Sequence, residues 1–313
     1  MKKNILNKIL IIIYLNIFLL PIEVSGDVKI ITKINNEIIT NIDIEEEYNY
    51  LIALNNDLKN LDRKSILKIA KDSLIREKIK KNELKKYYDF NVEVEILESI
   101  IENFYKKLNL NSELEFKSYL NNFELDFNDV KKKIKIEIFW NELIQKEFSN
   151  QININKEALK KKIKDEGLGT KLVISYNLSE IVFEIKDDDD LSTTFDKINQ
   201  SITSDGFKNT ANIFSISDTA KFGGNIGWVE ENQLSEKIID SLQSLNIGEI
   251  TKPISIANGF LILKLLDKKT KENLSDPKKI LEKLIGYEAN RQFTQFSLMH
   301  FNKLKLNTSI INE

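Results

Sequence analysis

The sequence predicts an α+β protein in which a helical N-terminal region is followed by a smaller sheet-containing domain and completed by a C-terminal helix. Amphipathic stretches with helical spacing occupy residues 61–148, which indicates an all-helical region. From residue 172 the apolar residues alternate in strand fashion, and glycine-punctuated turns follow. The 313 residues, of which 42% are hydrophobic and 30% charged, are enough to bury two cores.

The first 26 residues are predicted to be a cleaved signal peptide. Three lysines precede an apolar run at residues 9–20, and the small residues at 24–26 suit a signal peptidase. A retained membrane anchor is the second interpretation, but the run is shorter than the roughly 20 apolar residues that span a bilayer. We therefore expect export to the periplasm and no stable membrane insertion after cleavage.

Local signals define the elements of the mature N-terminal region. The segments 29–34 and 37–40 flank two asparagines, which tolerate the positive φ of a hairpin turn. Thr40 and Asp43 have the spacing of a helix start. A typical apolar helix face is formed by Val94, Leu97, Ile101, Phe104 and Leu108. This region is predicted to extend over residues 27–168.

The sheet domain is predicted at residues 171–269. A strand at 172–185 is expected to lead through the acidic loop 187–190 and a helix at 191–202 to glycine-rich turns and a strand at 260–266. A third segment, residues 272–313, is predicted to pack on the N-terminal region. Its helix should start at Pro277, and the alternation of Leu304, Lys305 and Leu306 resembles a short strand.

Composition excludes several classes of function. Lys and Arg number 46 against 48 Asp and Glu, so the net charge of −2 gives no cationic field for nucleic acid. With no cysteine and with His300 as the only histidine, disulfides, thiolate sites and histidine-rich centres are excluded. The contiguous Asp187 to Asp190 lack the ligand spacing of a calcium loop. We therefore expect neither a cofactor nor a metal.

Three blocks of the sheet domain carry a family resemblance. They are Phe222–Trp228, Leu245–Pro253 and Asn258–Lys264. Together they resemble the parvulin (PpiC-like) family of peptidyl-prolyl isomerases, or rotamases. The hairpin and helices before them look like the N-terminal domain of SurA chaperones. That resemblance implies a helical chaperone core completed by the returning C-terminal helix, with one parvulin-like domain, an antiparallel sheet surrounded by helices, where SurA has two.

The parvulin resemblance also implies which positions form the isomerase centre. Where the family has a histidine on the first strand, this sequence has Glu180, and where a second histidine follows Gly-Phe, it has Leu261. The acidic or cysteine position of the family falls on Ser217, or on Asp218 if the loop shifts by one residue. The chemistry of the catalytic positions is therefore altered.

The apolar positions of a proline pocket are retained. The resemblance places them at Leu234, Ile238 or Ile239, and Phe260. By strand alternation Glu180 shares a face with Leu178 and Val182 and could point into this pocket, although an edge glutamate that reaches solvent is an equal alternative. A pocket can bind peptide without the polar centre that catalysis requires.

Three functions follow from these observations. The first is an ATP-independent periplasmic chaperone that binds unfolded exported or outer-membrane proteins, as the SurA resemblance implies. The second is an active peptidyl-prolyl cis-trans isomerase, or foldase. The third is a scaffold subunit that binds one dedicated partner. The breadth of the clients separates the first function from the third.

Overall fold

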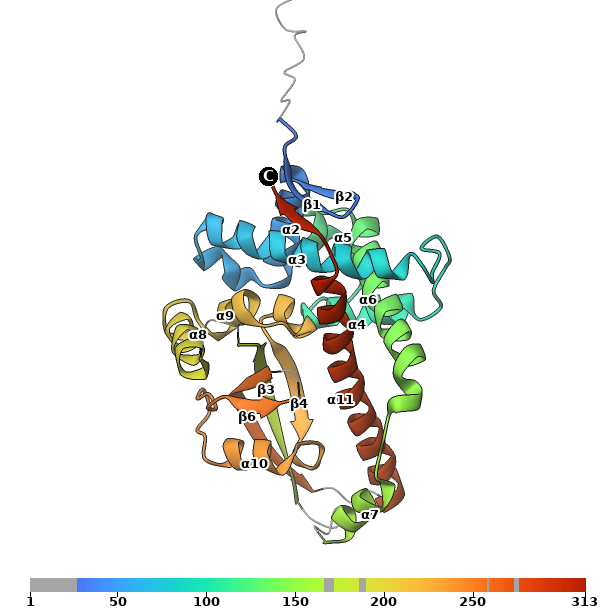
Figure 1. Ribbon diagram of the computed structural model, residues 1–313. Coiled ribbons are helices and arrows are strands. Elements are labelled where there is room, and N and C mark those ends of the chain that lie inside the picture. The colour runs from blue at the N-terminus through green and yellow to red at the C-terminus, as the bar shows by residue number, and fades with distance from the viewer. Residues whose placement is uncertain (1–26, 166–171, 186–189, 258, 273–275) are drawn as a thin grey trace, which may run out of the picture.

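The computed structural model describes residues 27–165, 172–185, 190–257, 259–272 and 276–313 (Figure 1). The predicted signal peptide and most of the predicted acidic loop lie outside these residues. None of the helices in the described ranges has the length and apolar character needed to cross a membrane. Helices form one end of the molecule and an antiparallel sheet the other, which confirms the predicted α+β class.

We call the helical end the helical module. Its helices are α2 (Asn41–Leu54), α3 (Arg63–Leu84), α4 (Leu97–Lys107), α5 (Glu113–Asn121) and α6 (Phe127–Phe148), with short 3₁₀ turns η1 (Asn56–Asn60) and η2 (Ser149–Gln151). Helix α7 (Lys156–Asp165) lies at the other end of the molecule, where it packs against the start of α11 (Pro277–Leu306) (Figure 1). Thr40 and Asp43 form the predicted capping box, in which each side chain accepts a hydrogen bond from the backbone of the other. Asp126 caps α6 by accepting hydrogen bonds from the backbone N–H groups of Asn128 and Asp129.

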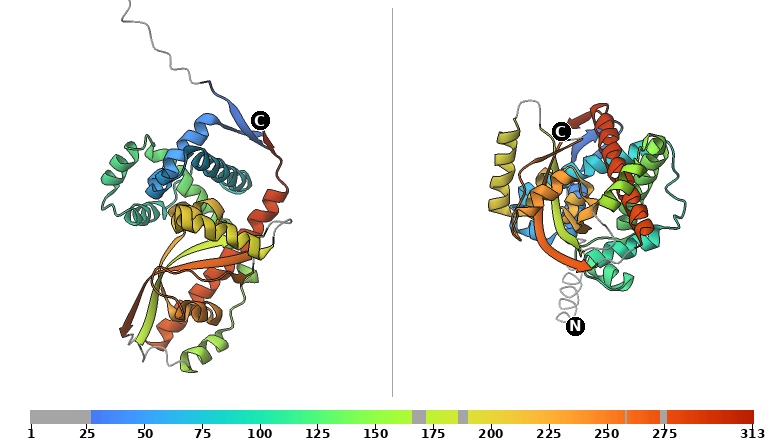
Figure 2. Two further views of the ribbon diagram at one scale, coloured as in Figure 1. Left: turned by 90° about the vertical axis from the view of Figure 1, so that its left-hand side faces the viewer. Right: turned by 90° about the horizontal axis from the view of Figure 1, so that it is seen from below.

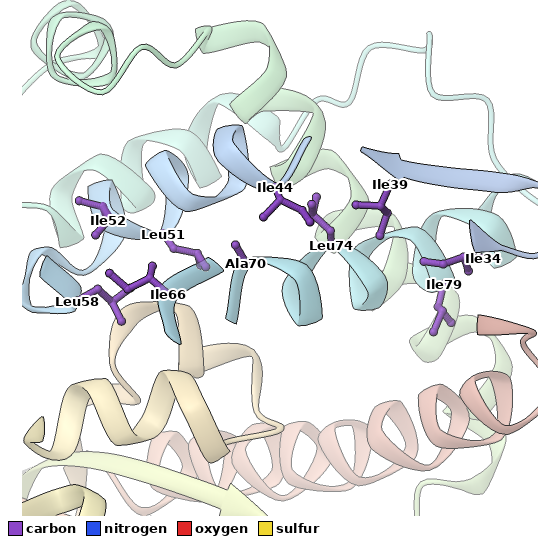
Figure 3. Packing of buried hydrophobic residues seen from close by; sticks show 10 residues of the cluster. All are labelled: Ile34, Ile39, Ile44, Leu51, Ile52, Leu58, Ile66, Ala70, Leu74 and Ile79. Atoms are coloured by element: carbon purple, nitrogen blue, oxygen red, sulfur yellow. The ribbon is translucent and has the colours of Figure 1, made fainter. Parts of the chain in front are cut away.

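The core of the helical module lies between α2, α3 and the N-terminal hairpin. Ile34 and Ile39 of the hairpin, Leu51 of α2 and Ile66 of α3 are almost completely buried. Figure 3 shows these side chains meeting in one apolar layer. Each fully buried aliphatic side chain of this kind contributes about 1.5–3 kcal/mol to folding. The apolar side chains of the predicted amphipathic faces are therefore largely buried in packing contacts.

The two ends of the described chain meet in a three-stranded antiparallel sheet. Strand β1 (Ile30–Ile34) pairs with β2 (Glu37–Thr40) on one side and with β7 (Ile310–Asn312) on the other. Asn35 has a φ of 51°, as the hairpin prediction requires. The prediction of a strand at 304–306 was wrong, because those residues form the last turn of α11 (Pro277–Leu306). Three alternating residues are too few to distinguish a strand from a helix end.

We call the sheet end the sheet module. Its four strands follow the order β4 (Asn225–Glu230), β3 (Leu172–Phe183), β6 (Gly259–Glu272) and β5 (Ile254–Ile256), and all neighbours are antiparallel. The sheet is accompanied by α8 (Leu191–Asp205), α9 (Phe207–Phe214), η3 (Asp218–Phe222), η4 (Glu231–Gln233) and α10 (Glu236–Gln243). The boundaries drawn from the sequence between domains stay predictions.

Two glycines allow backbone segments of the sheet module to approach closely. Gly224 has a φ of 76°, and a Cβ there would lie 2.1 Å from the carbonyl oxygen of Glu180. Gly259 has a φ of 119°, and its Cβ would lie 2.3 Å from the carbonyl oxygen of Phe183. No L side chain fits at either position. Gly248 lies in a turn after α10, which ends at Gln243.

Helix α11 connects the two modules. It runs from the far end of the sheet module back to the helical module (Figures 1 and 2). There Phe296 stacks on Phe148 of α6 with ring centroids 4.7 Å apart, and Ser297 accepts a hydrogen bond of 2.8 Å from the Trp140 indole. The predicted docking of the C-terminal helix on the N-terminal region is thus present.

A group of ion pairs ties η3 of the sheet module to α3 and α6. Lys80 Nζ lies 2.8 Å from a Glu137 oxygen and 3.0 Å from an Asp218 oxygen, and Lys221 lies 3.2 Å from Glu137. Burial alone would raise the pKa of Glu137, but Lys221 and Lys80 bring it well below its usual range. Buried pairs of this kind fix relative orientation because an unpaired partner would be costly.

Candidate functional site

A cavity of about 970 Å³ lies between the sheet module and helices α3 and α11. Its volume is at the upper end of the range for small-ligand pockets. The apolar part of its lining comes from the sheet module, α7 and α11 and consists of Leu159, Val182, Ile216, Ile226, Leu234, Ile238, Ile254, Ile256, Ala257, Leu261, Leu284, Leu298 and Phe301. The cavity is therefore a composite of the sheet face and the returning helix.

A hydrogen-bonded polar cluster stands in the wall of this cavity. Glu180 on β3 accepts hydrogen bonds at one carboxylate oxygen from Ser217 Oγ at 2.7 Å and from Thr219 Oγ1 at 2.9 Å. The backbone N–H of Glu180 donates to the Gly224 carbonyl at 2.8 Å. The bond requires the close approach that Gly224 permits. The backbone and both hydroxyls thus hold the carboxyl in one orientation.

The surroundings of Glu180 change its acidity. Burial raises its pKa above the usual glutamate value, and the nearby Asp218 charge acts in the same direction. The hydrogen bonds from Ser217 and Thr219 favour the ionised form but only partly offset this effect. The carboxyl consequently stays protonated to a higher pH than an exposed glutamate, and in that state it can donate a hydrogen bond.

The structure brings most of the sequence-predicted site residues together. The cavity lining includes Glu180, Ser217, Leu261, Leu234 and Ile238. Strand alternation correctly placed Glu180 on the face of Leu178 and Val182, and the alternative of a solvent-facing edge glutamate does not hold. Their catalytic or binding roles stay predictions.

Phe260 lies elsewhere. It precedes Leu261 on β6, so its side chain points to the opposite face of the sheet. There it stacks on Phe183 with ring centroids 5.7 Å apart. The expectation that Phe260 contacts the proline ring of the substrate is therefore corrected. Side chains alternate along a strand, so the adjacent residues Phe260 and Leu261 cannot point to the same face. Ile239, the alternative to Ile238, packs in the core beneath the cavity and is absent from its lining.

Sequence reasoning missed the part of the site that comes from α3 of the helical module and from α11. Arg76 and Lys80 of α3, and Tyr287 and Arg291 of α11, line the cavity. Burial raises the pKa of Tyr287, and the Glu180 charge adds to the effect, so α11 lies within electrostatic reach of the polar cluster. No local sequence signal links these helices to β3, since their proximity depends on how the modules dock.

The cavity lining combines apolar surface with polar and charged side chains. His300 lies away from it, with its ring centroid 5.5 Å from that of Trp140. Within the described ranges, no group of three or more acidic or histidine side chains could hold a metal ion. The cavity offers an apolar surface, two oriented hydroxyls and one buried carboxyl.

The protein family of the sheet module follows from comparison with known sequences. A family model described as "Rotamase: PPIC-type PPIASE domain" matches residues 176–267. The sheet module is a PpiC-type rotamase domain. This PpiC-type domain contains the polar cluster as well as Leu234, Ile238 and Leu261.

Relatives that match more of the chain than this domain are named as chaperones and foldases. The Chaperone SurA of Pseudomonas putida is 28% identical over 162 residues, which cover 50% of this chain and 38% of the relative. The Foldase protein PrsA 2 of Bacillus cereus is 25% identical over 175 residues, covering 56% of this chain and 55% of the relative. The match thus spans about two fifths to about half of these proteins.

A solved structure also resembles the chain. One of two SurA-like chaperones of Campylobacter jejuni is 16% identical, with a TM-score of 0.35, over 91% of this chain and 98% of that one. With a helical module and a single PpiC-type domain, the chain is SurA-like.

Proposed function

We propose that the protein is an exported, ATP-independent chaperone for unfolded polypeptides, outer-membrane proteins among them, whose PpiC-type domain binds peptide segments with little isomerase activity. The observation that carries the proposal is a cavity that keeps its apolar lining while its polar centre is altered. Leu261, at a position where the resemblance implies histidine, is a buried hydrocarbon side chain in the cavity wall. It supports packing and cannot donate or accept a hydrogen bond.

Catalysis needs more than an apolar pocket. The barrier to rotation about the peptide bond is about 18–20 kcal/mol, because resonance gives the C–N bond double-bond character. A catalyst lowers it with oriented polar groups around the twisted amide. Here the altered family positions supply Glu180 with its two hydroxyl partners, and the hydrocarbon side chain of Leu261. We therefore expect binding to exceed catalysis.

The helical module offers a second apolar surface. Ile38 and Ile311 are about half exposed, and both lie opposite Lys33 in the three-stranded sheet, so all three side chains share its outer face. Exposed apolar patches are typical of interaction surfaces. Binding through modest patches is weak and reversible, as release without nucleotide requires.

The expected location is the periplasm. The support is the predicted signal peptide at residues 1–26, together with the similarity to SurA. Unfolded exported chains would be the clients in that compartment.

An active isomerase is the second candidate, and the geometry of Glu180 favours it. A protonated carboxyl aimed into the cavity, with one oxygen held by Ser217 and Thr219, leaves the other oxygen available to donate to a client carbonyl. On this mechanism isomerisation would decline as pH rises through the elevated pKa of Glu180.

A paired assay on residues 27–313 separates the candidates. One arm follows a proline-limited refolding reaction, and the other follows aggregation of an outer-membrane client in the same buffer. We expect suppressed aggregation with little acceleration of refolding. Strong acceleration that is lost in Glu180→Gln would establish the isomerase instead. No suppression at excess protein would contradict the chaperone, and suppression limited to one client would indicate a dedicated scaffold.

A further inference from the structure

The charged side chains around the cavity are not balanced. Five cations line it, namely Arg76, Lys80, Lys162, Lys237 and Arg291, against the carboxylates Glu180, Asp218 and Glu288. We propose that the cavity selects client segments in which an apolar residue is flanked by acidic side chains, with Arg76, Lys162 and Lys237 as the residues that determine this specificity. The inference rests on the proposed peptide binding and adds the class of peptide.

Two of the five cations are already neutralised. Lys80 pairs with both Glu137 and Asp218, and Arg291 forms two hydrogen bonds with Glu288 at 2.6 and 2.9 Å. Neither is available for an incoming carboxylate without losing an existing partner. Asp218 and Glu288 are the carboxylate partners in these contacts, so their charges are already neutralised as well.

The other three cations have no carboxylate partner among the residues that the structure describes. Arg76 donates only a long hydrogen bond of 3.5 Å to the Ile216 carbonyl. Lys162 donates one of 3.4 Å to the Asn232 carbonyl. Lys237 is exposed on α10. Arg76, Lys162 and Lys237 lie on three different helices, α3, α7 and α10. The excess positive charge is therefore distributed around the cavity.

Glu180 does not pair with any of these three cations. It is the only lining carboxyl without a cationic partner in the described residues, and both of its recorded side-chain hydrogen bonds come from neutral hydroxyls. Burial favours its neutral form. The cavity thus combines an apolar floor with a cationic rim.

An extended peptide with an apolar residue and an acidic neighbour matches both features. The volume of about 970 Å³ accommodates a short segment rather than a folded domain. The apolar side chain would lie on Leu234, Ile238 and Leu261, while a flanking carboxylate would pair at the rim. Lysine in the same place would be repelled. Charges at a rim alter affinity modestly and are screened by salt.

The test measures binding of three fluorescent peptides to the mature chain by anisotropy. The peptides share an Ala-Leu-Pro-Ala centre and differ only in flanking Asp, Asn or Lys residues, and all carry an amidated C-terminus. We expect the Asp peptide to bind about fivefold more tightly than the Lys peptide at low salt, with Asn between them and the spread reduced at 0.5 M salt. A fourth peptide, with Asn flanks and a free C-terminus, tests whether a terminal carboxylate is read instead.

Matched variants locate the effect. Arg76→Gln and Lys162→Gln should each reduce the preference for the Asp peptide about twofold. Lys164→Gln is the control, because Lys164 lies exposed on the same helix as Lys162 but outside the cavity lining. Circular dichroism would verify folding of each variant.

The outcomes distinguish this inference from the proposed function. Equal affinity for the three amidated peptides, or a preference that Lys164→Gln reduces as much as Lys162→Gln, would overturn the acidic selectivity and leave peptide binding intact. Affinity that follows only the free C-terminus would overturn it as well. Absence of any peptide binding would remove both the selectivity and the peptide-binding role of the PpiC-type domain.

Discussion

The two faces of the four-stranded sheet are built from the same strands but serve different ends. On one face Ile181, Phe183 and Ile262 pack against α8 and α9 and are almost fully buried. On the other face Val182 and Leu261, their immediate neighbours, line the cavity beneath α11. Because side chains alternate along a strand, adjacent residues can be selected separately for stability and for binding.

The largest expected effect tests this contrast in stability. Ile262→Ala should lower the free energy of unfolding by about 2–5 kcal/mol, because it opens a void in a closed core. Leu261→Ala should cost less, since that side chain already borders an open space, yet it should weaken peptide binding more. Urea denaturation and peptide anisotropy would measure both. An equal loss of stability in the two variants would break the comparison.

A second prediction concerns the ion pairs that hold the sheet module, with its cavity face, against the helical module. Glu137→Ala leaves Lys80 and Lys221 short of a carboxylate at the interface, so stability should fall by about 3 kcal/mol. The depressed pKa of Glu137 means that its contribution is present above its unfolded pKa of about 4.5 and is lost as pH falls through the folded value. Denaturation from pH 7 to pH 3 would follow this.

The control for the interface is Glu157→Ala, which removes an exposed pair with Lys160 on α7. Exposed pairs contribute at most about 1 kcal/mol. A loss for Glu137→Ala that is no larger than this control would show that the interface does not depend on the ion pairs.

The smallest expected effect concerns Glu180. Its raised folded pKa means that the folded state retains a proton more readily, so its favourable contribution is present at low pH and is lost as pH rises through the folded value. Glu180→Gln cannot ionise, so its stability relative to the wild type should increase between pH 4 and pH 8. Parallel denaturation curves at both pH values would measure the difference. A constant offset would show that the carboxyl is not perturbed.

Local chemistry explains which parts of the fold could be predicted from the sequence. The capping box at Thr40, the turn at Asn35 and the proline at the start of α11 all depend on neighbours within a few residues. Strand alternation predicted that Glu180 shares a face with Leu178 and Val182, but it left open whether the side chain enters the cavity or reaches solvent. The same alternation along β6 places Phe260 and Leu261 on opposite faces of the sheet.

The helical contribution to the site could not be predicted in this way. Arg76 and Tyr287 lie about one hundred residues on either side of Glu180 in the sequence. They line the same cavity as Glu180 because the ion pairs of Lys80 and Lys221, together with α11, join the two modules. Such contacts leave no local periodicity to detect.

The pairing of β1 with β7 sets the order in which the protein can be assembled. Thr32 lies opposite Asn312, so this strand pair joins segments that are 280 residues apart in the sequence. Contacts so distant in sequence form slowly, because closing a long loop is entropically costly. Until residues 310–312 arrive, β1 keeps an unpaired edge that other extended chains could occupy. The small sheet is therefore complete only after β7 has paired with β1.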